Sequence, residues 1–252
     1  MIDINSYRHE KEKTYYSVCL VFGIISWCVL FLITFGMVIF YGLFMALILY
    51  IMQQFFHAKL YGNAVKVSET QYSEIFNIIK NCCEELSIHK IPNTFIVNGQ
   101  GIVNAVAVKF LSKKYVLLYS DLTDLMLKRK QMNELKMIIA HELAHHAAGH
   151  TSLKRNLPIW PSKIIPFLGT AYSRACELTC DRIGHKMTED HFASQRALIS
   201  IASGSEALAS EVDIESFKKQ EHEISPFFGF LYEIISTHPR MTQRVLELER
   251  FK

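Results

Sequence analysis

The chain has 252 residues, enough for one catalytic domain and a membrane anchor. Its net charge of +3 is small and evenly spread, so we expect no nucleic-acid partner. Half of the residues are hydrophobic, which is high for a soluble domain, and the excess is concentrated near the N-terminus. The six cysteines lack the spacing of a small secreted disulfide framework, and we expect free thiols in a reducing compartment.

The N-terminal segment predicts a transmembrane helical hairpin. Residues 14–58 contain no Asp, Glu, Lys or Arg, and these 45 residues can hold two spans of about 20 residues each. We expect spans near 16–33 and 37–55, joined by a turn at 34–36. A cleavable signal peptide fits poorly because the apolar stretch is too long. A buried hairpin of a soluble protein and a single long tilted span are the alternatives.

Basic residues flank the outer ends of this hairpin and are absent from its turn. The first span is preceded by Arg8, Lys11 and Lys13, and the second span is followed by Lys59 and Lys66. By the positive-inside rule, the N-terminus and the domain after the hairpin lie in the cytoplasm. We therefore expect an integral protein of the cell membrane, in contact with membrane lipid. Residues 1–58 would form the tail and hairpin, and residues 59–252 the catalytic domain.

The domain after the hairpin is predicted to be α+β, mainly helical with a small β-sheet. A capping box at residues 68–71 predicts the start of an amphipathic helix, which Pro92-Asn93 ends. Runs rich in β-branched and aromatic residues predict three strands: 94–97, 102–110 and 115–119. Helices are then expected at 120–127, from the cap Asn133 to Gly149, and at 170–187, 189–222, 227–235 and 242–251.

The helix expected after Asn133 carries the motif His141-Glu142-Leu143-Ala144-His145. Residues four apart share one face of a helix, so His141 and His145 can each present a ring nitrogen to one metal ion, with Glu142 beside them. Zinc suits these donors and lowers the pKa of bound water toward about 7. The pattern H-E-x-x-H therefore predicts a catalytic site with one Zn²⁺ per chain. The alternative is an ordinary amphipathic helix with partly buried histidines.

A catalytic zinc site needs a third protein ligand. The metzincin pattern would require Gly and His three and six residues after His145, where this chain has Ala148 and Thr151, so that pattern is excluded. Glu177, on the next long helix, is our candidate ligand. Asp181 follows one turn later and would accept a hydrogen bond from the far ring nitrogen of a ligand histidine. A surface acidic pair is the alternative for these two residues.

Four other potential ligands lie close to these positions. Cys176 and Cys180 are weaker candidates, because a thiolate adds negative charge to the metal and makes its bound water a poorer acid. His146 and His150 form a second pair four residues apart. His146 is rotated by about 100° from His145, so we expect this second pair to pack or to cap the end of the helix.

The combination of H-E-L-A-H with a later E-x-x-x-D resembles the gluzincin peptidases of the HtpX type. These are related to the prenyl-protein endopeptidases and to the Oma-type mitochondrial peptidases. The resemblance runs from about residue 68 to the C-terminus. Further motifs carry it in the same order: Asp121-Leu122-Thr123-Asp124-Leu125, Glu134-Leu135-Lys136, residues 172–177, Asp181-Arg182, and Thr237-His238-Pro239 with Arg244. It implies a membrane zinc metallopeptidase with a protein or peptide substrate.

The resemblance also implies roles for residues outside the zinc motif. Asn104-Ala105 matches a pair on the edge strand that binds the substrate backbone. His238 would lie across the cleft and hydrogen-bond the developing oxyanion. HtpX itself carries a second membrane hairpin between the two metal-binding helices, which residues 151–170 are too polar and too rich in proline to supply. We expect a lid, a membrane-surface loop or a plain connection there.

These features predict a membrane-anchored zinc endopeptidase. His141, His145 and Glu177 would hold the ion, while Glu142 would take a proton from water and return it to the leaving amine. Turnover of membrane proteins or peptides is the expected role. The alternative is a non-catalytic zinc-binding membrane protein that holds unfolded clients, although such a site does not need Glu142. A structural membrane protein with packed histidines is the third hypothesis.

Overall fold

The computed structural model describes residues 1–252 except 102–103, 111–112, 129, 166, 205 and 252. A 3-10 turn, η1 (Ile4–Tyr7), precedes two long helices, α1 (Glu10–Ile33) and α2 (Val38–Asn63). The turn between them falls where expected, with positive φ at Phe35 and Gly36. Both helices are long and apolar enough to cross a membrane. In the most apolar 18-residue stretch of each helix, only 11% (α1) and 6% (α2) is buried inside the protein. This low burial argues against a hairpin enclosed in a soluble protein.

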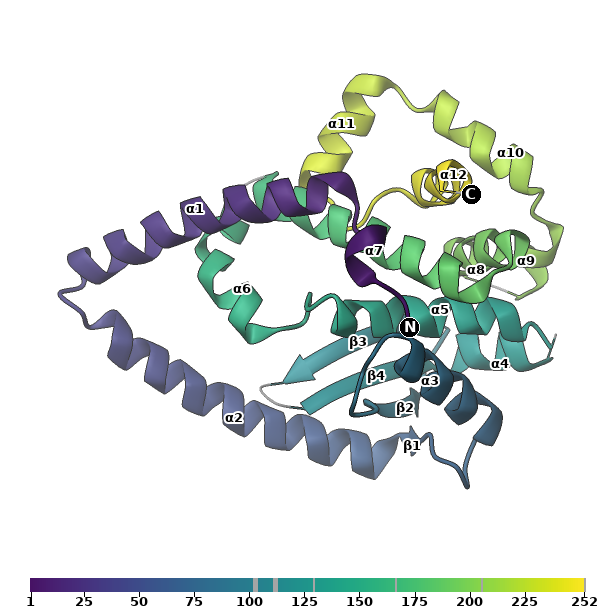
Figure 1. The fold of residues 1–252 in the computed structure, drawn as a ribbon, viewed down its shortest axis with the longest axis horizontal. Helices are drawn as coiled ribbons and strands as arrows, with labels where there is room; N and C mark the ends of the chain where they lie inside the picture. Colours follow the sequence, from purple (N-terminus) through teal and green to yellow (C-terminus); the bar gives the residue numbers. More distant parts are fainter. Residues whose placement is uncertain (102–103, 111–112, 129, 166, 205, 252) are drawn as a thin grey trace.

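The two long helices diverge from their shared turn (Figure 1). α1 packs along α6 (Leu153–Ile159), the 3-10 turn η2 (Pro161–Ile164) and α7 (Leu168–Thr188). α2 instead leads into the sheet and contacts its first two strands. The hairpin is therefore tied to the domain at two separate places, one on the helical side and one on the sheet.

The sheet has four strands in the order β1-β2-β4-β3. Their bounds are β1 (Val65–Lys66), β2 (Asn93–Val97), β3 (Ala105–Phe110) and β4 (Lys113–Tyr119). β2 and β4 are parallel, and the other two pairs are antiparallel. The three predicted strands are confirmed, although Ile102 and Val103, the predicted start of the second, lie outside the described residues. β1 was missed because two residues carry no periodicity. β3 lies at an edge of the sheet.

The helices of the domain follow the predicted order, with corrections at their ends. The remaining bounds are α3 (Ser73–Glu85), α4 (Ser120–Lys128), α5 (Met132–Ala147), α8 (His191–Ser203), α9 (Glu206–Glu211), α10 (Ile214–Lys219), η3 (Gln220–Glu223), α11 (Pro226–Ile235) and α12 (Met241–Arg250). The predicted capping box is wrong, since Ser68 and Gln71 pair through their own backbones in a tight turn before α3. Asn133 does not cap α5; its amide donates to Asp190 instead. The predicted helix at 189–222 is divided at Gly204, where φ is +64°.

Helices α5 and α7 cross at the centre of the domain, and their close approach positions the site. A Cβ atom at Gly184 of α7 would lie 2.8 Å from the sulfur and 3.0 Å from the carbonyl oxygen of Met137 on α5. Only glycine allows this contact without a shift of the backbone. Glu177 and Asp181 precede Gly184 on the buried side of α7. The crossing therefore brings both carboxylates to the face of α5 that carries the histidines.

Candidate metal centre

Two histidines of α5 and a glutamate of α7 bring three donor atoms together. Nε2 of His141 lies 3.3 Å from Nε2 of His145, and each nitrogen lies 3.4 Å from a different carboxylate oxygen of Glu177. A tetrahedral zinc ion with bonds of about 2.0 to 2.1 Å would separate neighbouring ligand atoms by about 3.3 Å. The donor types and their spacing therefore fit a zinc ion with a fourth position toward solvent.

Asp181 and Arg244 support the first of the two candidate ligand histidines, His141, from behind. Nδ1 of His141 is 2.9 Å from Oδ1 of Asp181, and the Arg244 guanidinium donates to both oxygens of that carboxylate at 2.6 and 2.7 Å. Burial would lower the pKa of His141, but the contacts with Asp181 and Glu177 outweigh it and raise the pKa to about 10. The negative charge around this imidazole is what a bound cation would neutralise. The Asp181 carboxylate favours the tautomer that leaves Nε2 available to a metal.

A cavity of about 330 Å³ opens in front of the three donor atoms. Glu142 and His238 both line it, together with the first residues of strand β3. Glu142 is buried, at 8% exposure, so its carboxylate forms part of the wall. The side chain of His238 is 62% exposed, and its Nε2 lies 3.6 Å from a carboxylate oxygen of Glu177, so it stands at the rim. The lining of the cavity thus includes a carboxyl group and an imidazole besides the three donor side chains.

The strand that borders the cavity can accept an extended peptide. The amide of Tyr119 donates to the carbonyl of Asn104 at 3.1 Å, which directs the backbone of Asn104 toward β4. The direction alternates along an antiparallel strand, so the backbone groups of Ala105 and Ala107 face the open edge. Oδ1 of Asn104 accepts a hydrogen bond from the amide of Ala105 at 2.8 Å. Ala107, which also lines the cavity, is then the first residue able to offer its amide to an added strand.

The sequence also matches a known family over most of its length. The model of the family described as Peptidase family M48 matches residues 69–159 and 157–252. The chain belongs to peptidase family M48. It is similar to the plastoglobule-localized metallopeptidase 48, chloroplastic, of Arabidopsis thaliana, with 24% identity over 173 residues. The match covers 63% of this chain and 48% of that protein, so the chain spans about half the length of its relative.

Membership of family M48 confirms the prediction of a metallopeptidase, a hydrolase whose family depends on zinc. The structure confirms the predicted architecture of two long apolar helices followed by a mostly helical domain with a small sheet.

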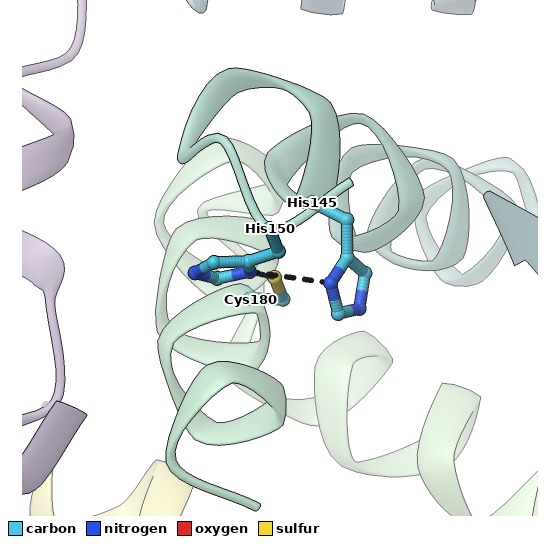
Figure 2. A group of neighbouring side chains, drawn as sticks. All are labelled: His145, His150 and Cys180. Atoms are coloured by element: carbon cyan, nitrogen blue, oxygen red, sulfur yellow. Dashed lines mark hydrogen bonds between the residues drawn. The ribbon is translucent and has the colours of Figure 1, made fainter. Parts of the chain in front are cut away.

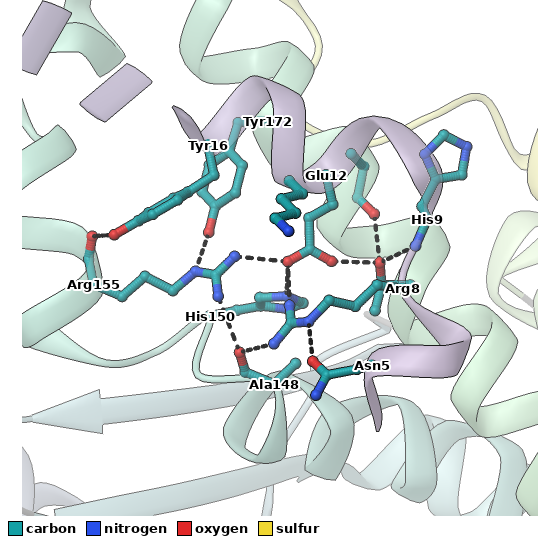
Figure 3. Close-up of polar contacts among 12 residues, drawn as sticks. Asn5, Arg8, His9, Glu12, Tyr16, Ala148, His150, Arg155 and Tyr172 are labelled. Atoms are coloured by element: carbon teal, nitrogen blue, oxygen red, sulfur yellow. Dashed lines mark hydrogen bonds and ion pairs between the residues drawn. The ribbon is translucent and has the colours of Figure 1, made fainter. Parts of the chain in front are cut away.

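The second candidate ligand of this M48 chain, His145, is held by a set of contacts that the sequence did not reveal. Nδ1 of His145 lies 3.2 Å from Nδ1 of His150 (Figure 2), and Nε2 of His150 lies 3.1 Å from the Glu12 carboxylate (Figure 3). When Nε2 of His145 faces a metal, its Nδ1 carries the proton and donates to His150, whose other nitrogen donates to Glu12. This chain of hydrogen bonds fixes the tautomer of His145, as the Asp181 carboxylate does for His141.

Glu12 is fully buried at the start of α1, and three of its partners, His150, Arg155 and Thr179, lie more than 130 residues away in the sequence. The guanidinium groups of Arg8 and Arg155 both contact its carboxylate (Figure 3). Thr179 also donates to it, at 2.5 Å. Two cations already balance this carboxylate, so it is poorly suited to a second metal ion despite the nearby imidazole. The network instead fastens the base of α1 to the end of α5 and to α7.

The two cysteines of α7 do not suit metal binding in this arrangement. Sγ of Cys180 lies 3.5 Å from Nδ1 of His150 (Figure 2), yet burial raises the pKa of this thiol well above its usual range. Burial likewise raises the pKa of Cys176 to about 12. Both groups are therefore protonated near neutral pH, whereas the thiolate is the form that binds zinc.

The residues singled out in the sequence come together, with one correction. Seven of them line the cavity: Asn104, Ala105, His141, Glu142, His145, Glu177 and His238; Asp181 lies behind it. His146 packs as expected, contacting the Tyr115 carbonyl at 3.0 Å. His150 does more than pack or cap, because it links His145 to Glu12. Sequence reasoning missed the roles of Glu12, His150 and Ala107, and of Arg244 despite its place in the H-P-x-x-x-x-R motif.

Proposed function

We propose that this M48 protein is a membrane-anchored zinc endopeptidase of the HtpX type that cleaves membrane proteins or membrane-proximal peptides. The observation that supports this most directly is the spacing of the His141, His145 and Glu177 donor atoms, 3.3 to 3.4 Å apart, at the floor of a cavity bordered by an edge strand. The three side chains would hold one zinc ion, with Asp181 fixing the orientation of His141.

The residues around the cavity supply the groups that peptide hydrolysis needs. When bound, zinc supplies Lewis-acid chemistry, which polarises the scissile carbonyl and lowers the pKa of water. Glu142 accepts a proton from the attacking water and then delivers it to the departing amine. His238, at the rim, donates a hydrogen bond to the oxygen that becomes negatively charged. The substrate lies along β3, with Asn104 just before the strand, Ala105 at its start and the Ala107 amide as its first outward donor.

The membrane location is part of the same proposal. Residues 1–58 would be the tail and anchor and residues 59–252 the peptidase domain, in agreement with a family match that begins at residue 69. The basic residues at the outer ends of the hairpin favour a cytoplasmic catalytic domain in the cell membrane. A catalytic site held next to the bilayer would meet membrane-proximal segments of its substrates.

The Glu142→Gln variant tests this assignment. The amide keeps the size of the side chain but cannot accept the proton, so we expect one zinc per chain by metal analysis and loss of casein cleavage. Wild-type cleavage should also stop on addition of a chelator and return with zinc. Casein cleavage that is equal in the variant and in wild type would contradict the role of Glu142. Binding of unfolded casein without cleavage by the wild-type protein would favour the client-holding alternative.

A further inference from the structure

We propose that residues 153–165, between the two metal-binding helices, form a re-entrant segment that lies in the hydrocarbon region of the bilayer and binds lipid through its outer face. The inference rests on the proposed membrane insertion of α1 and α2. It replaces the three roles expected from the sequence, a lid, a surface loop or a plain connection. The inference is drawn from the packing of α6 and η2 along α1.

Contacts with α1 give the depth of this re-entrant segment. At its entry, the hydroxyl of Tyr16 donates to the carbonyl of Arg155 at 3.4 Å. Further along, the indole nitrogen of Trp27 donates to the carbonyl of Leu157 at 3.0 Å. Thr14 is the first residue of the uncharged stretch, and at 1.5 Å per residue Trp27 lies about 20 Å beyond it along the helix axis. A bilayer hydrocarbon region is about 30 Å thick, so Leu157 is placed well inside it.

Two glycines hold the segment between the backbones of α1 and α7. A Cβ atom at Gly23 of α1 would overlap the carbonyl oxygen of Pro158 and lie 3.1 Å from Cα of Ile159. A Cβ atom at Gly169 of α7 would lie 2.7 Å from Cα of Lys163. Neither position tolerates a side chain without movement of the segment. The segment is therefore a packed part of the structure at this depth.

The surfaces exposed at this level are apolar on both α1 and the segment. Four residues of α1 on either side of Gly23 are about half exposed: Val21, Phe22, Ile24 and Ile25. Four residues of the segment are half exposed or more exposed than that: Leu153, Leu157, Trp160 and Ile164. Trp160 stacks on Trp27 with ring centroids 6.4 Å apart, which makes the two surfaces continuous. Lipid that covers α1 at this depth therefore also covers the segment.

Two basic residues of the segment, Arg155 and Lys163, have partners within the protein, as this environment requires. The Arg155 guanidinium turns inward and donates to the hydroxyl of Tyr172 at 2.8 Å. The ammonium of Lys163 donates to Oδ1 of Asn156 at 2.7 Å. Lys154 and Lys163 are both exposed. Lys154 lies on the first turn at the entry, and Lys163 reaches back toward that turn through Asn156, which donates to the carbonyl of Ser152, so both long side chains can extend toward the lipid headgroups.

The chain contains two tryptophans, so single replacements isolate each signal. Full-length Trp27→Phe, which retains Trp160, and Trp160→Phe, which retains Trp27, are reconstituted in phosphatidylcholine vesicles with and without bromine on the acyl chains. We expect acyl-chain bromine to quench Trp160 fluorescence about as strongly as that of Trp27, and aqueous iodide to quench neither. Casein cleavage by both variants shows that they are folded.

The matched pair separates failure of this inference from failure of the anchor. Quenching of Trp27 by brominated lipid, with Trp160 quenched by iodide alone, would overturn the re-entrant segment and leave the anchor intact. Quenching of neither tryptophan by brominated lipid would overturn both. If either replacement prevents folding, the wild-type chain labelled with 5-fluorotryptophan provides both signals at once. Broadening of both fluorine resonances by acyl-chain nitroxide lipids is then the expected result, and a Trp160 resonance left sharp would overturn the inference.

Discussion

Replacing Glu12 by glutamine tests how strongly the base of the anchor supports the metal centre. The glutamine keeps the shape of the side chain and one acceptor oxygen but removes the charge that faces Arg8 and Arg155. Removal of one partner from a buried ion pair costs about 3 to 5 kcal/mol, because the remaining charges stay buried without compensation. For a chain of this size, each kcal/mol of lost stability lowers the midpoint of thermal unfolding by about 2 to 4 °C. The midpoint should therefore fall by about 10 °C.

The neighbouring glutamate provides the matched control. Glu10 also contacts an arginine, Arg182 at 3.3 Å, but its side chain is 80% exposed. Exposed ion pairs contribute about 1 kcal/mol or less, so Glu10→Gln should change the midpoint by no more than about 4 °C. Both variants are measured in the same detergent and at the same protein concentration, by the loss of helical circular dichroism on heating.

The same variant has a second readout at the metal. Glu12 contacts His150, which contacts His145, so loss of the charge weakens the group that orients this ligand. Changes to such supporting groups typically reduce metal affinity by about 10-fold to 100-fold. Because glutamine can still accept from His150, we expect about 10-fold weaker zinc binding in competition with a chromogenic chelator. Equal unfolding midpoints and equal zinc affinities for Glu12→Gln and Glu10→Gln would refute this account.

Three further replacements test other parts of the structure. Arg244→Lys removes the two-point contact with Asp181, so zinc affinity should fall by about 10-fold to 100-fold; an unchanged affinity would remove Arg244 from the support of the site. Gly23→Ala should lower the unfolding midpoint, because overpacking against α6 costs about 1 to 3 kcal/mol, whereas the gain in helix propensity is about 1 kcal/mol. Gly42→Ala is the control: its Cβ would lie in open space, so the midpoint should not fall. Cys180→Ser should retain one zinc per chain by metal analysis, since the buried thiol is protonated; loss of the metal would restore the thiolate alternative.

Some features of this protein follow from the sequence alone, because their causes are local. The uncharged stretch at 14–58 fixes the length and number of the apolar helices, and the spacing of His141 and His145 places both on one helical face. Helix and strand order could be predicted from periodicity. Helix ends were less certain, since Asn133 has the right chemistry for a cap but bonds to Asp190, a partner 57 residues away.

Other features were decided only by tertiary structure, because they join residues that are distant in the sequence. No local pattern indicates that Glu12, at the start of α1, would meet His150, just beyond the end of α5. The depth of α6 along α1 likewise depends on the absence of a side chain at Gly23, where two backbones touch. A motif can nominate the donor atoms of a metal site, but the groups that orient those donors depend on which helices cross and how closely they approach.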